Sequence, residues 1–167
     1  MLIVLGGLPA TGKTTIARAL SRRVRGIHLR IDTIEQALRM SGRLGDDVGD
    51  AGYRVAYALA EDMLRLGQVV IADSVNPLQA TRAAWRAVAT RSAVPSVELE
   101  IIRSDAADHR ACAESRSADI DRLVLPSWAD IQARHYEPWT TPHVVIDTSG
   151  RTVDQSVAEA LGALQIY

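Results

Sequence analysis

The segment GLPATGKT at residues 7–14 sets the architecture of this chain, because it follows an apolar run at residues 2–6 and leads into a stretch of helical periodicity. It matches the Walker A pattern, which fixes the spacing of two glycines, a lysine and a hydroxyl residue. Gly7 and Gly12 permit a tight turn whose backbone N–H groups converge at the positive end of a helix, an arrangement that binds phosphate. The expected nucleotide-binding residues are Gly7, Leu8, Pro9, Ala10, Thr11, Gly12, Lys13, Thr14 and Thr15.

Two side chains of this loop carry specific chemistry. Lys13 is expected to reach the β- and γ-phosphates, and Thr14 to place its hydroxyl on Mg²⁺. Lys13 is also the only lysine, since every other one of the 19 lysine and arginine residues is an arginine. A guanine-specific Asn-Lys-x-Asp loop is therefore excluded, and Asn76 stands where a GTPase switch would need glycine. ATP and Mg²⁺ are the expected cofactors.

The rest of the chain alternates short apolar runs with segments of helical spacing. Strand alternating with helix predicts a parallel sheet with helices on both faces, so we expect one three-layer α/β domain over residues 1–167. Ligands of such sheets bind at the carboxyl ends of the strands. Strands are expected at residues 2–6, 27–31, 69–73, 97–103 and 144–147, and helices at 13–24, 50–66, 79–90, 106–116, 128–136 and 152–165.

Composition excludes several classes of protein. A net charge of −1 and an isoelectric point near 6.4 give no broad attraction to nucleic acid or to an anionic membrane. Cys112 is the single cysteine, which rules out an intramolecular disulfide. The apolar runs are far shorter than the ~20 residues that span a bilayer. Without a basic segment before residues 2–5 we expect no cleaved leader, and the cytoplasm is the expected compartment.

Two aspartates at strand ends are candidates for the chemistry. Asp73 ends the buried run at residues 69–73, where a Walker B carboxylate would hold Mg²⁺-bound water; the alternative is a strand-end cap. Asp32 follows the second predicted strand, where it could accept the proton of an acceptor hydroxyl, a role worth about 10²–10⁴ in rate. Its alternative is a helix N-cap that forms a capping box with Glu35, and both roles could coexist.

Arginines after the fourth predicted strand could neutralise a transferring phosphoryl group, an effect of about 10³–10⁵ in related chemistry. In an arginine-rich chain most of them are expected to be surface residues. Arg110 and Arg116 are the two predicted to act in catalysis, out of a set that comprises Arg103, Arg110, Arg116 and Arg122.

With these residues in view, the phosphate loop resembles that of small P-loop kinases of the zeta-toxin and chloramphenicol-phosphotransferase type. The segment VIADSVNP at residues 70–77, with Trp85 beyond it, is similar to a motif of polynucleotide kinases in the AAA_33-type group. The resemblance implies the sheet order 2-3-1-4-5, ATP as donor, Asp32 as base and a small lid at approximately residues 110–126. It places adenine between this lid and the loop at residues 147–150.

One departure from the polynucleotide kinases bears on the acceptor. Those enzymes usually carry an arginine three or four residues after the catalytic aspartate, where this chain has Glu35 and Gln36, and the next arginine is Arg39. This favours a small neutral or cationic acceptor. Tyr53 and Tyr57 could line its pocket, although core packing is the more common role of such tyrosines.

The sequence therefore predicts an ATP-dependent phosphotransferase that moves the γ-phosphoryl group to a hydroxyl of a small antibiotic-, nucleoside- or sugar-like molecule. An antibiotic-resistance role falls within this prediction, and binding to nucleic acid or a membrane is not expected. Two alternatives remain open: a polynucleotide 5′-hydroxyl kinase, and a nucleotide-binding ATPase module without a phosphoryl acceptor.

Overall fold

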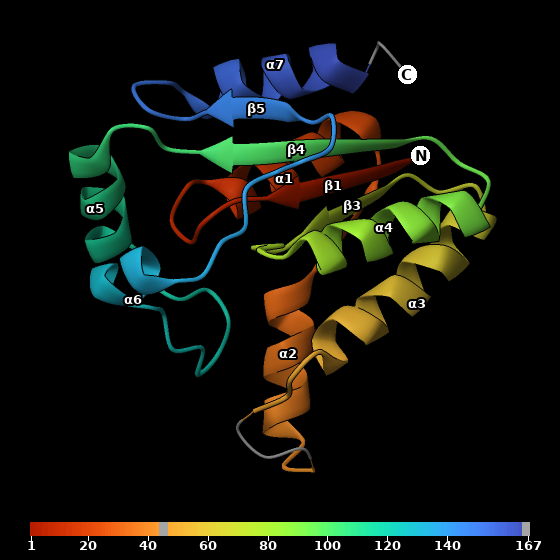
Figure 1. Ribbon diagram of the computed structural model, residues 1–167, viewed down its shortest axis with the longest axis horizontal. Helices are drawn as coiled ribbons and strands as arrows, with labels where there is room; N and C mark the ends of the chain where they lie inside the picture. The colour runs from red at the N-terminus through yellow and green to blue at the C-terminus, as the bar shows by residue number, and fades with distance from the viewer. Residues whose placement is uncertain (44–46, 165–167) are drawn as a thin grey trace.

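The computed structural model describes residues 1–43 and 47–164, and their centre is a parallel sheet of five strands in the order β2-β3-β1-β4-β5 (Figure 1). This confirms the predicted fold class and strand order. In the register of the sheet, Asp73 lies beside Leu5 on one side and Arg30 on the other. The strands are β1 Leu2–Gly6, β2 Ile27–Arg30, β3 Val70–Asp73, β4 Ser96–Ile102 and β5 Val144–Asp147.

Helices pack on both faces of the sheet. Alternate residues of β1 divide the core: Ile3 and Leu5 pack with α1 and α7, whereas Leu2 and Val4 pack with α3 and α4 (Figure 1). This is the expected alternation of a strand that is buried on both faces. The helices are α1 Lys13–Val24, α2 Ile31–Met40, α3 Ala51–Arg65, α4 Gln79–Arg91, α5 Ala106–Ser115, α6 Trp128–Ala133 and α7 Val153–Leu164.

Two segments differ from the sequence prediction. Ile31 begins α2 instead of ending β2, and the whole of α2 was absent from the predicted helices. Helix α6 ends at Ala133 and the chain then runs extended, although residues 128–136 had been predicted to be helical. Arg82 of α4 explains this difference, because it donates to the carbonyl oxygens of Glu137 and Pro138 and holds the chain extended there.

The extended connection at residues 134–143 covers part of the sheet, where no helix packs. It crosses β1 and β4 on its way from α6 to β5 (Figure 1), and Tyr136 and Thr141 donate hydrogen bonds to Glu100 and Glu98 on β4. A face that carries carboxylates needs such polar partners when it is covered. Among the described residues, no helix has the length and apolar character needed to cross a membrane.

Candidate active site

The turn between β1 and α1 has the backbone geometry of an anion site. Gly7 has a φ of 132°, and a Cβ atom there would lie 2.1 Å from the carbonyl oxygen of Ile101. Within the described residues, no backbone N–H of residues 10–15 donates a hydrogen bond to the protein. These donors lie at the N-terminus of α1, where unsatisfied N–H groups and the helix dipole favour a bound anion. The turn therefore fits a polyphosphate.

Lys13 is buried beside this turn, with 7% of its surface exposed. Its Nζ donates to the carbonyl oxygen of Leu8 at 2.6 Å. Burial lowers the pKa of Lys13 to about 8, although the negative charges of Asp73 and Asp32 oppose this effect. A buried ammonium without a close counter-ion is costly, and the oxygens of a bound phosphate are the kind of partner that removes this cost.

Asp73 lies at the end of β3 with 2% of its surface exposed, next to Lys13 and Thr14. Burial raises the pKa of Asp73, but hydrogen bonds from His28 and Thr14 and the charge of Lys13 outweigh burial and lower it. The carboxylate is therefore ionised at neutral pH. The His28 Nε2 atom lies 3.0 Å from Asp73 Oδ2, a contact that sequence reasoning missed because the two residues are 45 positions apart.

Asp32 is the second residue of α2 and lines the main cavity. The N-cap of α2 is Arg30 and no side chain caps this helix, so the predicted capping box of Asp32 and Glu35 is wrong. The helix starts two residues before the position that the capping box required. The charge of Asp32 acts on Lys13, Glu35 and Tyr53, which shows that these groups lie around the same space.

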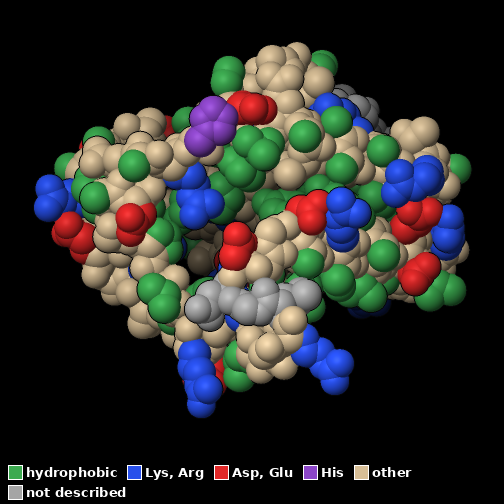
Figure 2. Space-filling view, turned by 60° about the horizontal axis from the view of Figure 1, so that its bottom comes forward, with side chains coloured by type: hydrophobic (Ala, Val, Ile, Leu, Met, Phe, Trp, Pro, Cys, Tyr) green, Lys and Arg blue, Asp and Glu red, His purple; other side chains and the backbone are tan. Residues whose placement is uncertain are grey.

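The cavity has a volume of about 1220 Å³. Its wall is formed by the phosphate turn, α2, the start of α3, the loop after β3 and residues 115–126. Figure 2 shows a hollow on this side of the molecule, with arginine and acidic side chains at its rim. Tyr53 lines the cavity and accepts a hydrogen bond from the Asn76 N–H at 3.1 Å. Tyr57 instead packs edge-on against Trp85 in the core, with ring centroids 4.6 Å apart.

The predicted arginines occupy different environments. Arg116 lines the cavity, and its buried Nε has no partner among the described residues. Burial lowers the pKa of Arg116, with the charge of Asp32 opposing the shift. Arg110 is not brought to the cavity: its side chain is 60% exposed and pairs with Glu114 on the surface of α5.

Arg134 is a cavity residue that sequence reasoning missed. It follows the last residue of α6, lines the cavity, and its charge acts on both Lys13 and Glu35. Two cationic side chains, Arg116 and Arg134, therefore approach the space between Lys13 and Asp32. The sequence contains no indication of this position. The helix predicted at residues 128–136 would have turned the Arg134 side chain in a different direction.

The segment between α5 and α6 is held across the mouth of the cavity by Asp119. Arg18 of α1 pairs with Asp119, and Arg30 Nη1 donates to both oxygens of this carboxylate at 2.9 Å. Burial raises the pKa of Asp119, but these two arginines outweigh burial and hold it at about 2. Gln36 Nε2 also donates to the carbonyl oxygen of Asp121 at 3.0 Å.

A second cavity of about 480 Å³ lies beside the loop at residues 147–150, where adenine was predicted to bind. Asp147 accepts hydrogen bonds from Ser104 and Ser149, which hold its pKa at about 2 against the raising effect of burial. The Thr148 hydroxyl donates to the Thr11 carbonyl oxygen at 2.9 Å, so this loop is tied directly to the phosphate turn.

Comparison with known proteins identifies the class. The model of the AAA_33 family, described as an AAA domain, matches residues 2–138, and the chain belongs to this family. The probable adenylyl-sulfate kinase of Aeropyrum pernix is 23% identical over 172 residues, which cover 95% of this chain and 88% of that protein.

Solved structures are similar over nearly the whole chain. The APS kinase of Mycobacterium tuberculosis in complex with AMPPNP and APS superposes with a TM-score of 0.74 at 19% identity, and covers 98% of this chain and 96% of its own. A gluconokinase from Sinorhizobium meliloti gives a TM-score of 0.70 at 16% identity, with 98% and 91% covered. At this level of identity the likeness shows a common fold.

Proposed function

We propose that this protein is an ATP-dependent phosphotransferase that moves the γ-phosphoryl group to a hydroxyl of a small molecule. The observation that carries the proposal is the convergence of Lys13, Asp32 and Asp73 on one cavity from three different strand ends. The similar proteins named adenylyl-sulfate kinase and gluconokinase support the same reaction class, and a similar structure that binds AMPPNP supports ATP as the donor.

The phosphates of ATP bind the N–H groups at the start of α1, and Lys13 Nζ moves from the Leu8 carbonyl to phosphate oxygens. Thr14 and Asp73 would hold Mg²⁺ at this turn, Thr14 through its hydroxyl and Asp73 through its buried carboxylate. Mg²⁺, when bound, neutralises charge on the β- and γ-phosphates. No cluster of three metal-ligating side chains occurs in the described part of the chain, which suits an ion that takes most of its ligands from phosphate and water.

Asp32 orients the acceptor hydroxyl and accepts its proton. Asp32 lies in the first turn of α2 and lines the cavity, and Arg30 Nη2 lies 3.5 Å from its Oδ2 atom, so the carboxylate is held where an acceptor hydroxyl would enter. Arg116 and Arg134 neutralise the charge that develops on the transferred group, because both line the cavity near Lys13. We assign this role to Arg134 in place of Arg110, whose guanidinium pairs with Glu114 outside the cavity.

The chain forms a single domain, and residues 110–126 act as a lid over its cavity. Asp119 supports this role, because its ion pairs with Arg18 and Arg30 attach this segment to the opposite wall of the cavity. The adenine base lies at the second cavity, between Arg103 on the lid side and the loop at residues 147–150.

The acceptor carries hydroxyl groups and no negative charge near Asp32. Glu35 stands one turn after Asp32 and lines the same cavity, and Gly52 leaves room for it, since a Cβ there would lie 2.3 Å from Glu35 Cγ. Burial raises the pKa of Glu35, with Arg39 opposing and Asp32 adding to the shift. Paired carboxylates favour polyhydroxylated or amino-bearing molecules, such as sugar-, nucleoside- or antibiotic-like compounds, over anionic ones.

The direct test is transfer of label from γ-labelled ATP to a panel of sugars, nucleosides, hydroxylated antibiotics and 5′-hydroxyl oligonucleotides. We expect transfer to at least one neutral or amino-bearing compound. Asp32→Asn should lower turnover about 100-fold or more while leaving ATP affinity unchanged, because the amide cannot accept the proton. Asp62→Asn on the exposed surface of α3 is the matched control and should behave as wild type.

The outcomes separate the alternatives. Transfer only to oligonucleotides would replace the proposal with a polynucleotide kinase. ATP hydrolysis without transfer to any compound would indicate an ATPase module. Full turnover in Asp32→Asn would remove the base from the mechanism.

A further inference from the structure

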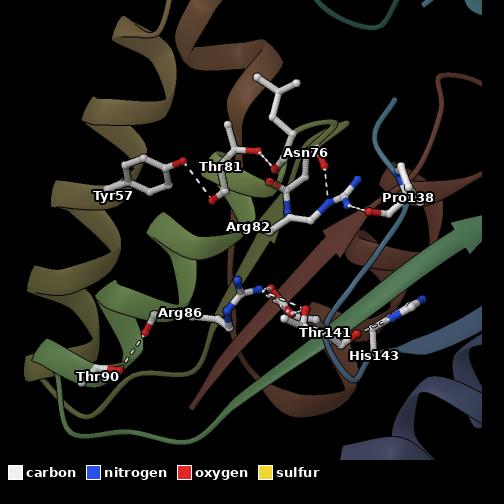
Figure 3. A network of polar contacts seen from close by, with 11 residues as sticks. Tyr57, Asn76, Thr81, Arg82, Arg86, Thr90, Pro138, Thr141 and His143 are labelled. Carbon is white, nitrogen blue, oxygen red and sulfur yellow. Dashed lines mark hydrogen bonds and ion pairs between the residues drawn. The ribbon is translucent and has the colours of Figure 1, made fainter. Parts of the chain in front are cut away.

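Arg82 is an arginine of α4 that is buried without a carboxylate partner in the described part of the chain. Only 2% of its surface is exposed. Its guanidinium donates to four backbone carbonyl oxygens, and Figure 3 shows two of these acceptors, Asn76 and Pro138. The acceptors are Asn76 at 3.0 Å from Nε, Pro138 at 3.1 Å from Nη1, and Pro77 at 3.1 Å and Glu137 at 2.7 Å from Nη2.

Aromatic rings complete the environment of this charge. The guanidinium carbon lies 4.2 Å from the ring centroid of Trp139 and 5.1 Å from that of Tyr136. Such contacts stabilise a desolvated cation. The planar fork of an arginine can serve several acceptors at once, whereas the single nitrogen of a lysine cannot reproduce this geometry.

The four carbonyls belong to two segments that are far apart in the sequence, residues 76–77 and residues 137–138. These segments also bond to each other: the Glu137 N–H donates to Pro77 at 2.9 Å, and the Gln79 N–H donates to Glu137 Oε2 at 2.6 Å. Neither segment belongs to a helix or strand. Arg82 is therefore the common anchor of two irregular segments.

Both segments carry parts of the candidate active site. The first follows Asp73 closely, and directly before it the Val75 carbonyl accepts a hydrogen bond from the Gly7 N–H of the phosphate turn at 3.0 Å. The second begins just after Arg134, which lines the cavity. Trp139 also packs against the strand that enters the turn, since a Cβ on Gly6 would lie 2.7 Å from its ring.

We infer that Arg82 is a positioning residue that holds Arg134 and the loop after Asp73 in register with the phosphate turn. This inference rests on the proposed function. Arg82 is absent from the residues that line the cavity and acts through backbone carbonyls. A displacement of about 1 Å in a group near the reacting atoms can cost about 100-fold in rate, so the anchor matters although it lies behind the site.

The test replaces Arg82 with lysine, which keeps the charge and loses the fork. We expect Arg82→Lys to lower kcat about tenfold or more while the KM for ATP changes little, because the phosphate turn itself stays formed. Arg91→Lys is the matched control: Arg91 is the last residue of α4 and pairs with Glu61 of α3, away from the two segments, so the kcat of this variant should equal that of wild type.

Coupling to Arg134 distinguishes positioning from a general loss of stability. Because part of the effect of Arg82 runs through Arg134, Arg82→Lys should lower kcat by a smaller factor in the Arg134→Ala background than in wild type. Multiplied losses in the double variant, or an unchanged kcat in Arg82→Lys, would overturn the inference. If Arg82→Lys does not fold, Trp139→Leu removes one ring from the guanidinium together with the Trp139 Nε1 bond to Tyr136, keeps the four hydrogen bonds of Arg82, and should show the same coupling.

Hydrogen exchange provides a readout that does not depend on catalysis. Arg82→Lys should speed amide exchange in residues 74–79 and 135–139 together, while exchange in α1 stays as in wild type. Unchanged exchange in either segment would overturn the anchoring role. Absence of transfer by wild type would instead count against the proposed function, so the two failures are distinguishable.

Discussion

Replacement of Lys13 by methionine should make the nucleotide-free protein more stable while it abolishes ATP binding. Burial lowers the pKa of Lys13 from 10.5 to about 8, which corresponds to roughly 3 kcal/mol against the folded state at pH 7. Methionine has a similar length and avoids this cost. The variant loses the hydrogen bond to Leu8, worth about 1 kcal/mol, but the Thr11 hydroxyl still donates to that carbonyl. We therefore expect a net gain of about 1–2 kcal/mol.

The pH dependence follows from the direction of the pKa shift. Because the pKa of Lys13 is lower in the folded state, the unfolded chain binds more protons between pH 8 and 10.5, and the stability of wild type rises with pH in this window. Below pH 8 both states carry the proton and the cost is fully present. The advantage of Lys13→Met should thus be constant up to about pH 8 and shrink as the pH rises further.

Urea unfolding without nucleotide at pH 7 and at pH 9.5 measures both effects. Arg22→Met on the exposed side of the same helix is the control and should change the free energy of unfolding by less than about 0.5 kcal/mol. A variant less stable than wild type at pH 7, or an advantage that does not shrink at pH 9.5, would refute the reasoning about the buried ammonium.

Two further predictions concern the backbone of the phosphate turn and the segment at its mouth. Gly7→Ala should destabilise the fold by more than about 2 kcal/mol and remove ATP binding, because the φ of Gly7 is positive and the added Cβ would meet the Ile101 carbonyl. The control is Gly162→Ala in α7, which should be neutral or slightly stabilising in urea unfolding. Equal behaviour of the two variants would contradict this account. Asp119→Asn should speed amide exchange in residues 116–123 and change the free energy of unfolding by less than about 1 kcal/mol, because the carboxylate is half-exposed. Asp121→Asn is the control. Exchange as slow as in this control would argue against the attachment of the segment through Asp119.

Features set by local sequence were predictable. The phosphate turn needs glycine at a position with positive φ, and Gly7 and Gly12 stand at the spacing that this turn requires. The buried strands are continuous apolar runs bounded by polar residues, so their positions and the sheet order followed from the sequence and from the family resemblance. Asp73 could be singled out because it ends such a strand, and the structure places it in the wall of the cavity.

Features set by tertiary contacts were not predictable from one sequence. Residues 31–40 have apolar positions at helical spacing, but the strand before them runs directly into the helix without a turn residue, so the strand was predicted one residue too long and the helix was missed. His28 and Asp119 find their partners 45 and 89 positions away, and no local pattern indicates such pairs. Arg134 was hidden because its segment is held extended by Arg82 from another helix.

The claim on which the account depends is that the turn after β1 binds the phosphates of ATP with Mg²⁺. Calorimetric titration of wild type and Lys13→Met with ATP, with and without Mg²⁺, tests it most directly. We predict saturable heat for wild type that strengthens with Mg²⁺, and none for the folded variant. An equal response of the two proteins, or no heat for wild type, would contradict the claim.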